Sequence, residues 1–278
     1  MINRCYLEIT NVCNLDCVFC PGHDREPREL TSSEFEQLTD KLEGRVKFLY
    51  FHLMGEPCMH SQLPDFVASA RKKGFIPVIT TNGTMLNTEL LDSLPYKINI
   101  SLHAFEGNDG DNPGRYMESV MDFSLKAADR GCIVVLRLWN RGGYDTKNDT
   151  ILNIIEHYVP KPWQDNRNGF GLAGNLYLEY DNMFSWPDSH DSGQYGSDMF
   201  CYALRNQIGV LSDGTVVPCC LDHNGNMALG NLFVQSLEDI LDSGRARRIF
   251  EGFSAHKAVE NMCSTCGYAA VTKRHRMD

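Results

Sequence analysis

The chain has 278 residues, 42% hydrophobic and 22% charged, which is enough apolar material for a packed core and unlike a disordered segment. Its 26 lysines and arginines against 36 aspartates and glutamates give a net charge of −10, which argues against a broad nucleic-acid surface. The apolar stretches, such as residues 133–136, fall far short of the roughly 20 residues that cross a bilayer, so we expect no membrane association.

The cysteine content is the unusual feature. There are eleven cysteines, an odd number that cannot pair completely within one chain. The first residues contain no apolar stretch typical of a secretion signal. We therefore expect a cytoplasmic protein, because in reducing surroundings clustered cysteines bind metals or react as thiols rather than form disulfides.

Short apolar runs alternate with helical patterns up to residue 181. The runs expected to form strands are residues 4–10, 46–53, 76–81, 97–102, 132–139 and 175–180. Helices are expected after the capping-box sequence Thr-Ser-Ser-Glu at 31–34, and over 63–73, 114–130 and 149–158. This alternation predicts an α/β fold of right-handed βαβ units, as an open sheet or as a full or partial barrel.

The composition changes after the sixth predicted strand. Residues 184–197 are polar and rich in Gly, Ser, Asp and Pro, which is typical of a linker or lid. A hairpin is expected next, with strands 207–211 and 215–217 joined by Ser-Asp-Gly. We predict a first domain over residues 1–183, a linker or lid over 184–199 and a small second domain over 200–278.

Three cysteines, Cys13, Cys17 and Cys20, follow the first predicted strand with the spacing Cys-x3-Cys-x2-Cys. Three thiolates on a short loop can ligate three irons of a [4Fe–4S] cluster and leave the fourth iron open. A three-cysteine zinc site or a loop of reactive thiols would also be compatible with the spacing.

At these cysteines the chain resembles the radical S-adenosylmethionine (SAM) superfamily, whose signature loop has this spacing in this place. The resemblance implies a partial (β/α)6 barrel of the TIM type and a cluster whose open iron binds the amino and carboxylate groups of SAM. In the family, reduction of the cluster cleaves SAM, and the 5′-deoxyadenosyl radical removes hydrogen from the substrate. A reducing partner such as flavodoxin or ferredoxin is implied as well.

Further family motifs fall at the carboxyl ends of predicted strands, where α/β folds place their sites. Gly55 and Glu56 stand in Met-Gly-Glu-Pro, where the family usually has Gly-Gly-Glu-Pro, and are implied to receive the methionyl amino group. Asn82 in Thr-Thr-Asn-Gly is implied to lie near the ribose. Ser101 in Ser-Leu-His, where the family has Ser-Leu-Asp, is implied to lie near the carboxylate or ribose.

Arg137 is a charge inside the apolar run of the fifth predicted strand. A buried arginine needs an anionic partner, either the methionyl carboxylate or a structural pair with Glu179 or Asp181. The polar and aromatic residues at predicted strand ends are candidate substrate contacts: His52, His103, Trp139, Asn140, Glu179 and Asp181.

The second cysteine group resembles the auxiliary-cluster domains of the family, called SPASM and, in shorter form, Twitch. Cys201, Cys219, Cys263 and Cys266 follow the pattern of a cysteine, Gly-x4-Cys and Cys-x2-Cys, and Cys219 rather than Cys220 completes the spacing. Four thiolates can ligate every iron of one auxiliary [4Fe–4S] cluster, or else a structural zinc ion. The resemblance to Twitch implies a single auxiliary cluster.

The ligand spacing resembles the Twitch dehydrogenases of the butirosin-pathway type, which oxidise a carbon of an aminocyclitol. This implies oxidation of a small polar molecule, such as an aminosugar, cyclitol or modified nucleobase, with the auxiliary cluster accepting or relaying an electron. Modification of a peptide is the alternative, although no peptide-recognition domain is expected before residue 13. A non-enzymatic iron–sulfur protein or a zinc-stabilised binding protein would not need the strand-end motifs.

Overall fold

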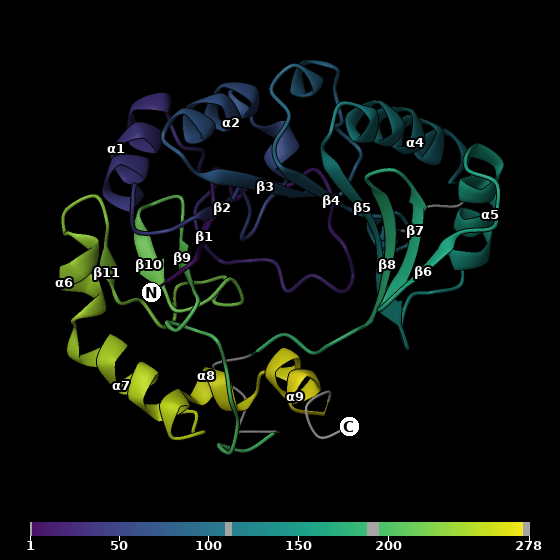
Figure 1. Ribbon diagram of the computed structural model, residues 1–278. Coiled ribbons are helices and arrows are strands. Elements are labelled where there is room, and N and C mark those ends of the chain that lie inside the picture. The colour runs from purple at the N-terminus through teal and green to yellow at the C-terminus, as the bar shows by residue number, and fades with distance from the viewer. Residues whose placement is uncertain (1, 109–112, 188–194, 275–278) are drawn as a thin grey trace. The chain divides into compact units, whose positions relative to one another are not determined.

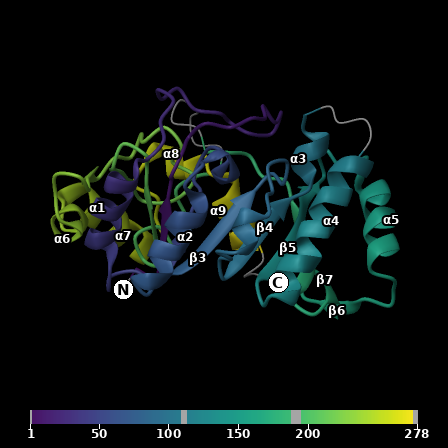
Figure 2. The same cartoon turned by 90° about the horizontal axis from the view of Figure 1, so that it is seen from above.

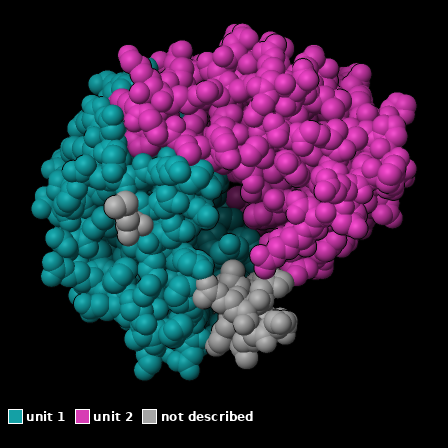
Figure 3. Space-filling model, in the orientation of Figure 1, with its two compact units in different colours: residues 1–11, 21–54, 184–278 teal, residues 12–20, 55–183 magenta. Residues whose placement is uncertain are grey.

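The computed structural model describes residues 2–108, 113–187 and 195–274, which form two compact units. Unit 1 comprises residues 1–11, 21–54 and 184–278, and unit 2 comprises residues 12–20 and 55–183 (Figure 3). The cysteine motif therefore folds with unit 2, while the residues on either side of it fold with unit 1. The domain boundaries expected at 183 and 200 stay a prediction, and residues 188–194 of the expected linker lie outside the described residues.

Unit 2 contains most of the parallel sheet. Its strands are β3 (Ile76–Thr81), β4 (Lys97–Ser101), β5 (Ile133–Arg141), β6 (Gln164–Asn166), β7 (Gly169–Ala173) and β8 (Leu176–Asn182). They are hydrogen-bonded in the order β3-β4-β5-β8-β7-β6, in which β3, β4, β5 and β8 are parallel and the last two pairings are antiparallel.

The helices of unit 2 are η1 (Pro57–Met59), α2 (Leu63–Lys72), η2 (Glu89–Leu91), α3 (His103–Glu106), α4 (Gly114–Asp129) and α5 (Asn148–Tyr158). Helix α2 contacts β3, and α4 contacts both β5 and α5 (Figure 1, Figure 2).

The parallel strands of unit 2 carry apolar residues on the face towards α4. Ile100 of β4 is fully buried and borders Gly83 together with Val120 of α4. Residues of the same face are equally buried: Ile98, Leu136 and Leu178. Asn99 and Arg137 point to the opposite face, because side chains alternate along a strand.

Unit 1 combines the first two strands with the C-terminal segment. Its strands are β1 (Arg4–Leu7), β2 (Phe48–Tyr50), β9 (Gln207–Val210), β10 (Thr215–Val217) and β11 (Gly230–Asn231), in the order β11-β10-β9-β1-β2. Strand β1 is parallel to both β2 and β9, whereas β9 and β10 form an antiparallel hairpin. The helices are α1 (Ser32–Leu42), α6 (Leu237–Leu241), α7 (Gly244–Ser254), α8 (Asn261–Ser264) and α9 (Gly267–Arg274).

The predicted α/β class is confirmed, and every expected strand and helix is present with ends shifted by a few residues. Helix α1 begins with the expected capping box: the Thr31 hydroxyl accepts from the Glu34 N–H, and the Glu34 carboxylate accepts from the Thr31 N–H. The β6–β7 extension and the pairing of β9 with β1 were not expected from the sequence. No helix in the described part of the chain is long and apolar enough to cross a membrane.

Candidate functional site

The cysteine motif forms a loop of unit 2 that carries Cys13, Cys17 and Cys20, with thiols that are exposed or half-buried. The side-chain amide of Asn108 donates to the Cys17 sulfur, with an N···S distance of 3.0 Å. The loop backbone also donates a hydrogen bond of 3.0 Å to the Gly107 carbonyl. Residues just after α3 therefore hold the middle of the loop.

The three thiols influence one another electrostatically. Burial raises the pKa of Cys17 to about 11, and the charges of Cys13 and Cys20 add to this shift while the Asn108 amide opposes it. Cationic iron would relieve this repulsion, and thiolate is the ligand that iron–sulfur clusters use, so the residues present fit such a cluster. Within residues 2–108, 113–187 and 195–274, no three His, Cys, Asp or Glu side chains are placed to share a single metal ion.

Glu56 joins the chain after β2 to the end of β3. Its carboxylate is buried and accepts from the Thr81 hydroxyl (2.6 Å) and from the backbone N–H groups of Asn82 (2.7 Å) and Cys58 (2.9 Å). Burial raises the pKa of Glu56, and these hydrogen bonds oppose the increase. The side chain is thereby held in one orientation.

The strand-end motifs also contact the cysteine loop. The Asn82 amide donates to Asn14 Oδ1 at 3.0 Å and lies 3.9 Å from the Cys13 sulfur. Gly55 has a φ of 74°, a left-handed conformation that favours glycine. The N–H that follows it donates to the Val12 carbonyl at 2.9 Å. Two of the residues that resemble family SAM contacts thus lie directly beside the motif.

Ser101, Arg137 and Glu179 lie in register across β4, β5 and β8. Arg137 Nε is 3.8 Å from a carboxylate oxygen of Glu179, and its guanidinium carbon is 4.1 Å from the centre of a Trp139 ring. The structural pair left open by the sequence is therefore present. Binding of the methionyl carboxylate by Arg137 stays a prediction.

His103 begins α3 and lies against the cysteine loop, with its ring centre 5.1 Å from that of Phe19. Its Nδ1 is 3.1 Å from the Arg137 carbonyl oxygen and 3.4 Å from the backbone nitrogen of Trp139. Burial lowers the pKa of His103 to about 4. The imidazole is consequently neutral at physiological pH.

The remaining candidate substrate contacts lie in three different places. Asn140 is buried and its amide donates to Asn148 Oδ1 (2.9 Å) at the start of α5. Asp181 accepts from the N–H of the next residue (2.8 Å). His52 belongs to unit 1, where it lies edge-on to the Tyr6 ring at 5.5 Å. Their contact with substrate stays a prediction.

Five cysteines gather in unit 1: Cys201, Cys219, Cys220, Cys263 and Cys266. Burial raises the pKa of Cys219, and charge interactions with the other four add to the shift. Burial also raises the pKa of Cys266 to about 11 and that of Cys220 to about 12. Half-buried thiols that repel one another fit a cationic iron–sulfur centre for the same reason as the first group.

Cys220 is the member of this group that spacing did not select. It packs with Tyr6 against a small apolar cluster, and the Tyr6 hydroxyl donates a hydrogen bond to it. Spacing could not reveal this, because the contact joins the first strand to residues far along the chain.

Arg245 ties together the segments that carry this cysteine group. Its guanidinium forms a fork on the Glu260 carboxylate, with two contacts of 2.8 Å, just before α8. It also donates to the carbonyls of Asn226 (3.1 Å) and Ala228 (3.3 Å). The loop after β10 and the segment leading to Cys263 are therefore held by one side chain.

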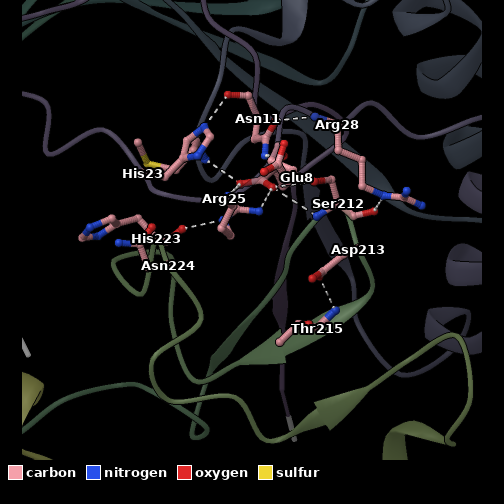
Figure 4. Close-up of polar contacts among 12 residues, drawn as sticks. Glu8, Asn11, His23, Arg25, Arg28, Ser212, Asp213, Thr215, His223 and Asn224 are labelled. Atoms are coloured by element: carbon pink, nitrogen blue, oxygen red, sulfur yellow. Dashed lines mark hydrogen bonds and ion pairs between the residues drawn. The ribbon is translucent and has the colours of Figure 1, made fainter.

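A buried carboxylate, Glu8, anchors the residues that follow the cysteine motif (Figure 4). Arg25 donates to both of its oxygens, at 2.7 and 2.6 Å. The N–H and hydroxyl of Ser212 donate to it at 3.1 and 2.9 Å, and the Met54 N–H does so at 3.2 Å. The sequence signal that could have pointed to this network is a glutamate within the predicted strand 4–10, directly after the apolar end of β1.

Other contacts of the same network connect the segment after Cys20 to the C-terminal hairpin and the loop beyond it. Arg25 Nε donates to the His223 carbonyl (2.9 Å), and Arg28 Nε donates to the Ser212 carbonyl (2.7 Å). The Asp24 N–H donates to the side chain of Asn224 at 2.9 Å.

Comparison with protein families is consistent with this geometry. The sequence-family model of the radical SAM superfamily matches residues 7–157, more than half of the chain. The chain belongs to the radical SAM superfamily. The model of the SPASM iron–sulfur cluster-binding domain matches residues 201–267, which include all five cysteines of the second group. The protein is thus a radical SAM enzyme, whose cofactors are SAM, the [4Fe–4S] cluster that binds it and auxiliary iron–sulfur.

Individual relatives resemble this radical SAM enzyme to different extents. It is 39% identical over 93 residues to the tungsten-containing aldehyde ferredoxin oxidoreductase cofactor-modifying protein of Pyrococcus furiosus, covering 32% of this chain but only 26% of that protein. It is 24% identical to the S-adenosyl-L-methionine-dependent 2-deoxy-scyllo-inosamine dehydrogenase of Niallia circulans, over 98% of this chain and 95% of that one.

Solved structures share the fold. BtrN in complex with AdoMet and 2-DOIA is 19% identical and has a TM-score of 0.57, over 96% of this chain and 93% of that chain.

Proposed function

We propose that this radical SAM enzyme is an oxidoreductase that dehydrogenates a carbon of a small polar molecule, such as an aminosugar or cyclitol. The observation that carries the proposal is the similarity, along nearly the whole chain, to a SAM-dependent 2-deoxy-scyllo-inosamine dehydrogenase. The presence of a three-cysteine loop and a separate group of cysteines supports it, because oxidation releases an electron that a second cluster can take up.

In this proposal the two cysteine groups hold two [4Fe–4S] clusters. Cys13, Cys17 and Cys20 would ligate the SAM-binding cluster. The auxiliary cluster would be ligated by four cysteines of unit 1: Cys201, Cys219, Cys263 and Cys266. When bound, these cofactors supply a 5′-deoxyadenosyl radical that takes hydrogen from the substrate carbon, and an acceptor for the remaining electron. A flavodoxin or ferredoxin would deliver the initial electron.

The strand-end residues of unit 2 would bind SAM. The Glu56 carboxylate, immobilised by three donors, offers a fixed negative charge to the methionyl ammonium group. The Asn82 amide and the Ser101 hydroxyl can bond ribose hydroxyls. Arg137 can pair with the carboxylate of SAM, and Gly55 permits the left-handed turn directly before Glu56.

The candidate substrate contacts have the chemistry that an amino- or hydroxyl-bearing ring requires. Glu179 keeps 34% of its side chain exposed and can accept hydrogen bonds from such groups. The Trp139 ring offers an apolar face. His103 remains neutral near pH 7, so it can hydrogen-bond a substrate without adding charge.

Cluster content and SAM cleavage test the proposal. Anaerobically purified protein should contain about eight irons and eight sulfides per chain, as two [4Fe–4S] clusters require. With dithionite, SAM and 2-deoxy-scyllo-inosamine, it should form 5′-deoxyadenosine and a product with two fewer hydrogens.

The Cys17→Ala protein should retain about four irons and form no 5′-deoxyadenosine. Cys132→Ala is the matched control, because Cys132 is buried in unit 2 outside the motif. Stoichiometric zinc in place of iron would contradict the cluster assignment. Turnover of a peptide, with none of any aminocyclitol or aminosugar, would contradict the substrate class.

A further inference from the structure

Asn108 connects the end of α3 to the middle of the cysteine loop. Its backbone follows Gly107, the residue that caps α3 and whose carbonyl accepts the Val18 N–H at 3.0 Å. A Cβ at Gly107 would collide with the Phe19 ring, so the absence of a side chain there lets the two segments approach closely. The neighbouring Asn108 side chain is thereby brought within hydrogen-bond distance of the loop.

The orientation of the Asn108 amide follows from its partners. One of its atoms accepts the backbone N–H of Asp16 at 2.9 Å, and because a backbone N–H only donates, this atom is Oδ1. The amide nitrogen donates to the Ala104 carbonyl at 2.7 Å and to the Cys17 sulfur at 3.0 Å. Both hydrogens of the amide are therefore used, and one of them is directed at the thiol.

This donor distinguishes Cys17 from Cys13. The Asn82 amide nitrogen is 3.9 Å from the Cys13 sulfur and makes its closer contact with Asn14 Oδ1 at 3.0 Å. Hydrogen bonds to the sulfurs are among the factors that set the reduction potential of an iron–sulfur cluster. The reduced cluster carries more negative charge than the oxidised one, so a donor to a ligating sulfur stabilises the reduced form more.

We propose that Asn108 acts through Cys17 as a positioning residue that raises the reduction potential of the SAM-binding cluster. This inference rests on the proposed function, because it requires Cys17 to ligate that cluster. The consequence concerns the first step of the reaction, in which a flavodoxin or ferredoxin gives one electron to the cluster and is itself oxidised. Asn108 sets how much of the cluster is reduced at a given potential of this partner.

Two substitutions remove the donor in different ways. Asn108→Asp keeps an oxygen for the Asp16 N–H but has no N–H for the thiol, and it adds a charge. Asn108→Leu adds no charge but also loses the bond to Asp16. What the two variants share is the loss of the donor to Cys17. Thr84→Val is the matched control, because Thr84 Oγ1 accepts from the Asn14 side chain at 2.8 Å and so holds the same loop through a residue other than a cysteine.

The potential is measured on the anaerobically purified, cluster-loaded chain by redox titration at about pH 8, where an aspartate carboxylate is ionised. The paramagnetic signal of the reduced cluster gives the reduced fraction, and the SAM-binding cluster is identified as the one whose signal changes when SAM is added. Iron and sulfide are determined in every variant. Protein labelled with nitrogen-15 in its asparagine side chains shows whether the reduced cluster is coupled magnetically to a side-chain nitrogen.

Asn108→Leu should lower the ratio of reduced to oxidised cluster about tenfold at a fixed potential, which is about 59 mV for a one-electron transfer. Asn108→Asp should lower the ratio at least as much, because repulsion by the new charge adds to the lost bond. Thr84→Val should change it less than about twofold. All variants should keep about eight irons per chain, and the nitrogen coupling should disappear in Asn108→Leu and persist in Thr84→Val.

Three results would overturn the assignment. An unchanged ratio in Asn108→Leu would show that the hydrogen bond does not act on the cluster, and an equal shift in Thr84→Val would show that any loosening of the loop has this effect. Loss of about four irons in both Asn108 variants would show that the side chain is needed to retain the cluster rather than to set its potential. If the native protein held no iron, or no cluster that responded to SAM, the proposed function would fail and this inference with it. A failure confined to the Asn108 variants leaves the proposed function intact.

Discussion

Replacing Glu8 with glutamine should destabilise unit 1, because the change turns one of two acceptor oxygens into a donor. Five donors converge on the native carboxylate: two nitrogens of Arg25, the N–H and hydroxyl of Ser212, and the Met54 N–H. Glu8 is fully buried, so water cannot replace a lost partner.

The size of the effect follows from the two possible orientations of the new amide. If its nitrogen takes the place of Oε2, one Arg25 nitrogen and the Met54 N–H lose their acceptor. If it takes the place of Oε1, the other Arg25 nitrogen and both Ser212 groups do. Each unpaired buried donor costs about 1–3 kcal/mol, and removing one partner of a buried ion pair costs about 3–5 kcal/mol. We expect the free energy of unfolding to fall by about 3–5 kcal/mol.

Urea denaturation of the loaded protein, followed by circular dichroism, measures this loss. Arg45→Met is the control, because Arg45 pairs with Glu238 in the same unit but the two side chains are 48% and 57% exposed. Such exposed pairs contribute about 0–1 kcal/mol. Arg25→Lys should also destabilise the protein, since an ammonium group lacks the planar fork that makes two parallel bonds to the carboxylate, and it has no second nitrogen for the His223 carbonyl. A loss in Glu8→Gln no larger than that in Arg45→Met would refute the reasoning.

Other predictions concern pH, a helix cap and a turn. Stability should fall by about 3 kcal/mol between pH 7 and pH 4 on account of His103, because its pKa is about 4 when folded and 6.5 when unfolded, so the unfolded chain binds the proton first. In His103→Phe, the free energy of unfolding, measured by urea titration at several pH values, should lose this part of its dependence on pH. An unchanged pH dependence would contradict the prediction. Thr31→Ala should lose about 1 kcal/mol through the N-cap of α1 and Thr31→Ser almost none, and equal losses would exclude a capping role. Gly83→Ala should cost more than about 1 kcal/mol and weaken SAM binding measured by calorimetry, because φ is +80° and a Cβ would meet Ile100 at 2.8 Å, directly after Asn82. If Gly83→Ala unfolded at the same midpoint as the native protein and bound SAM with the same affinity, the predicted strain would be absent.

The sequence was sufficient for the chemistry and for most local structure. Cysteine spacing predicts an iron–sulfur loop because the three cysteines lie within eight residues, from Cys13 to Cys20. The capping box at Thr31 and the turn between β9 and β10 depend on neighbouring residues, and both form as predicted. Interactions between residues only a few positions apart in the sequence can be recognised without knowing the fold, which is why these features were predictable.

The features that the sequence did not reveal depend on contacts between distant parts of the chain. Glu8 and Ser212 are 204 residues apart, and their contact exists because β9 pairs with β1 rather than only with β10. The hydrogen bond between Tyr6 and Cys220 likewise joins the first strand to residues far along the chain.

Asn99 illustrates the division between sequence and tertiary structure. By itself, the sequence places a polar residue in an apolar strand. Strand register places Asn99 beside Thr80, on the same face of the sheet as Ser101 two residues further along β4. A shift by one residue would turn the same amide towards α4, since side chains alternate along a strand. The sequence therefore determines which groups the protein has, and long-range strand pairing determines which of them share a face of the sheet.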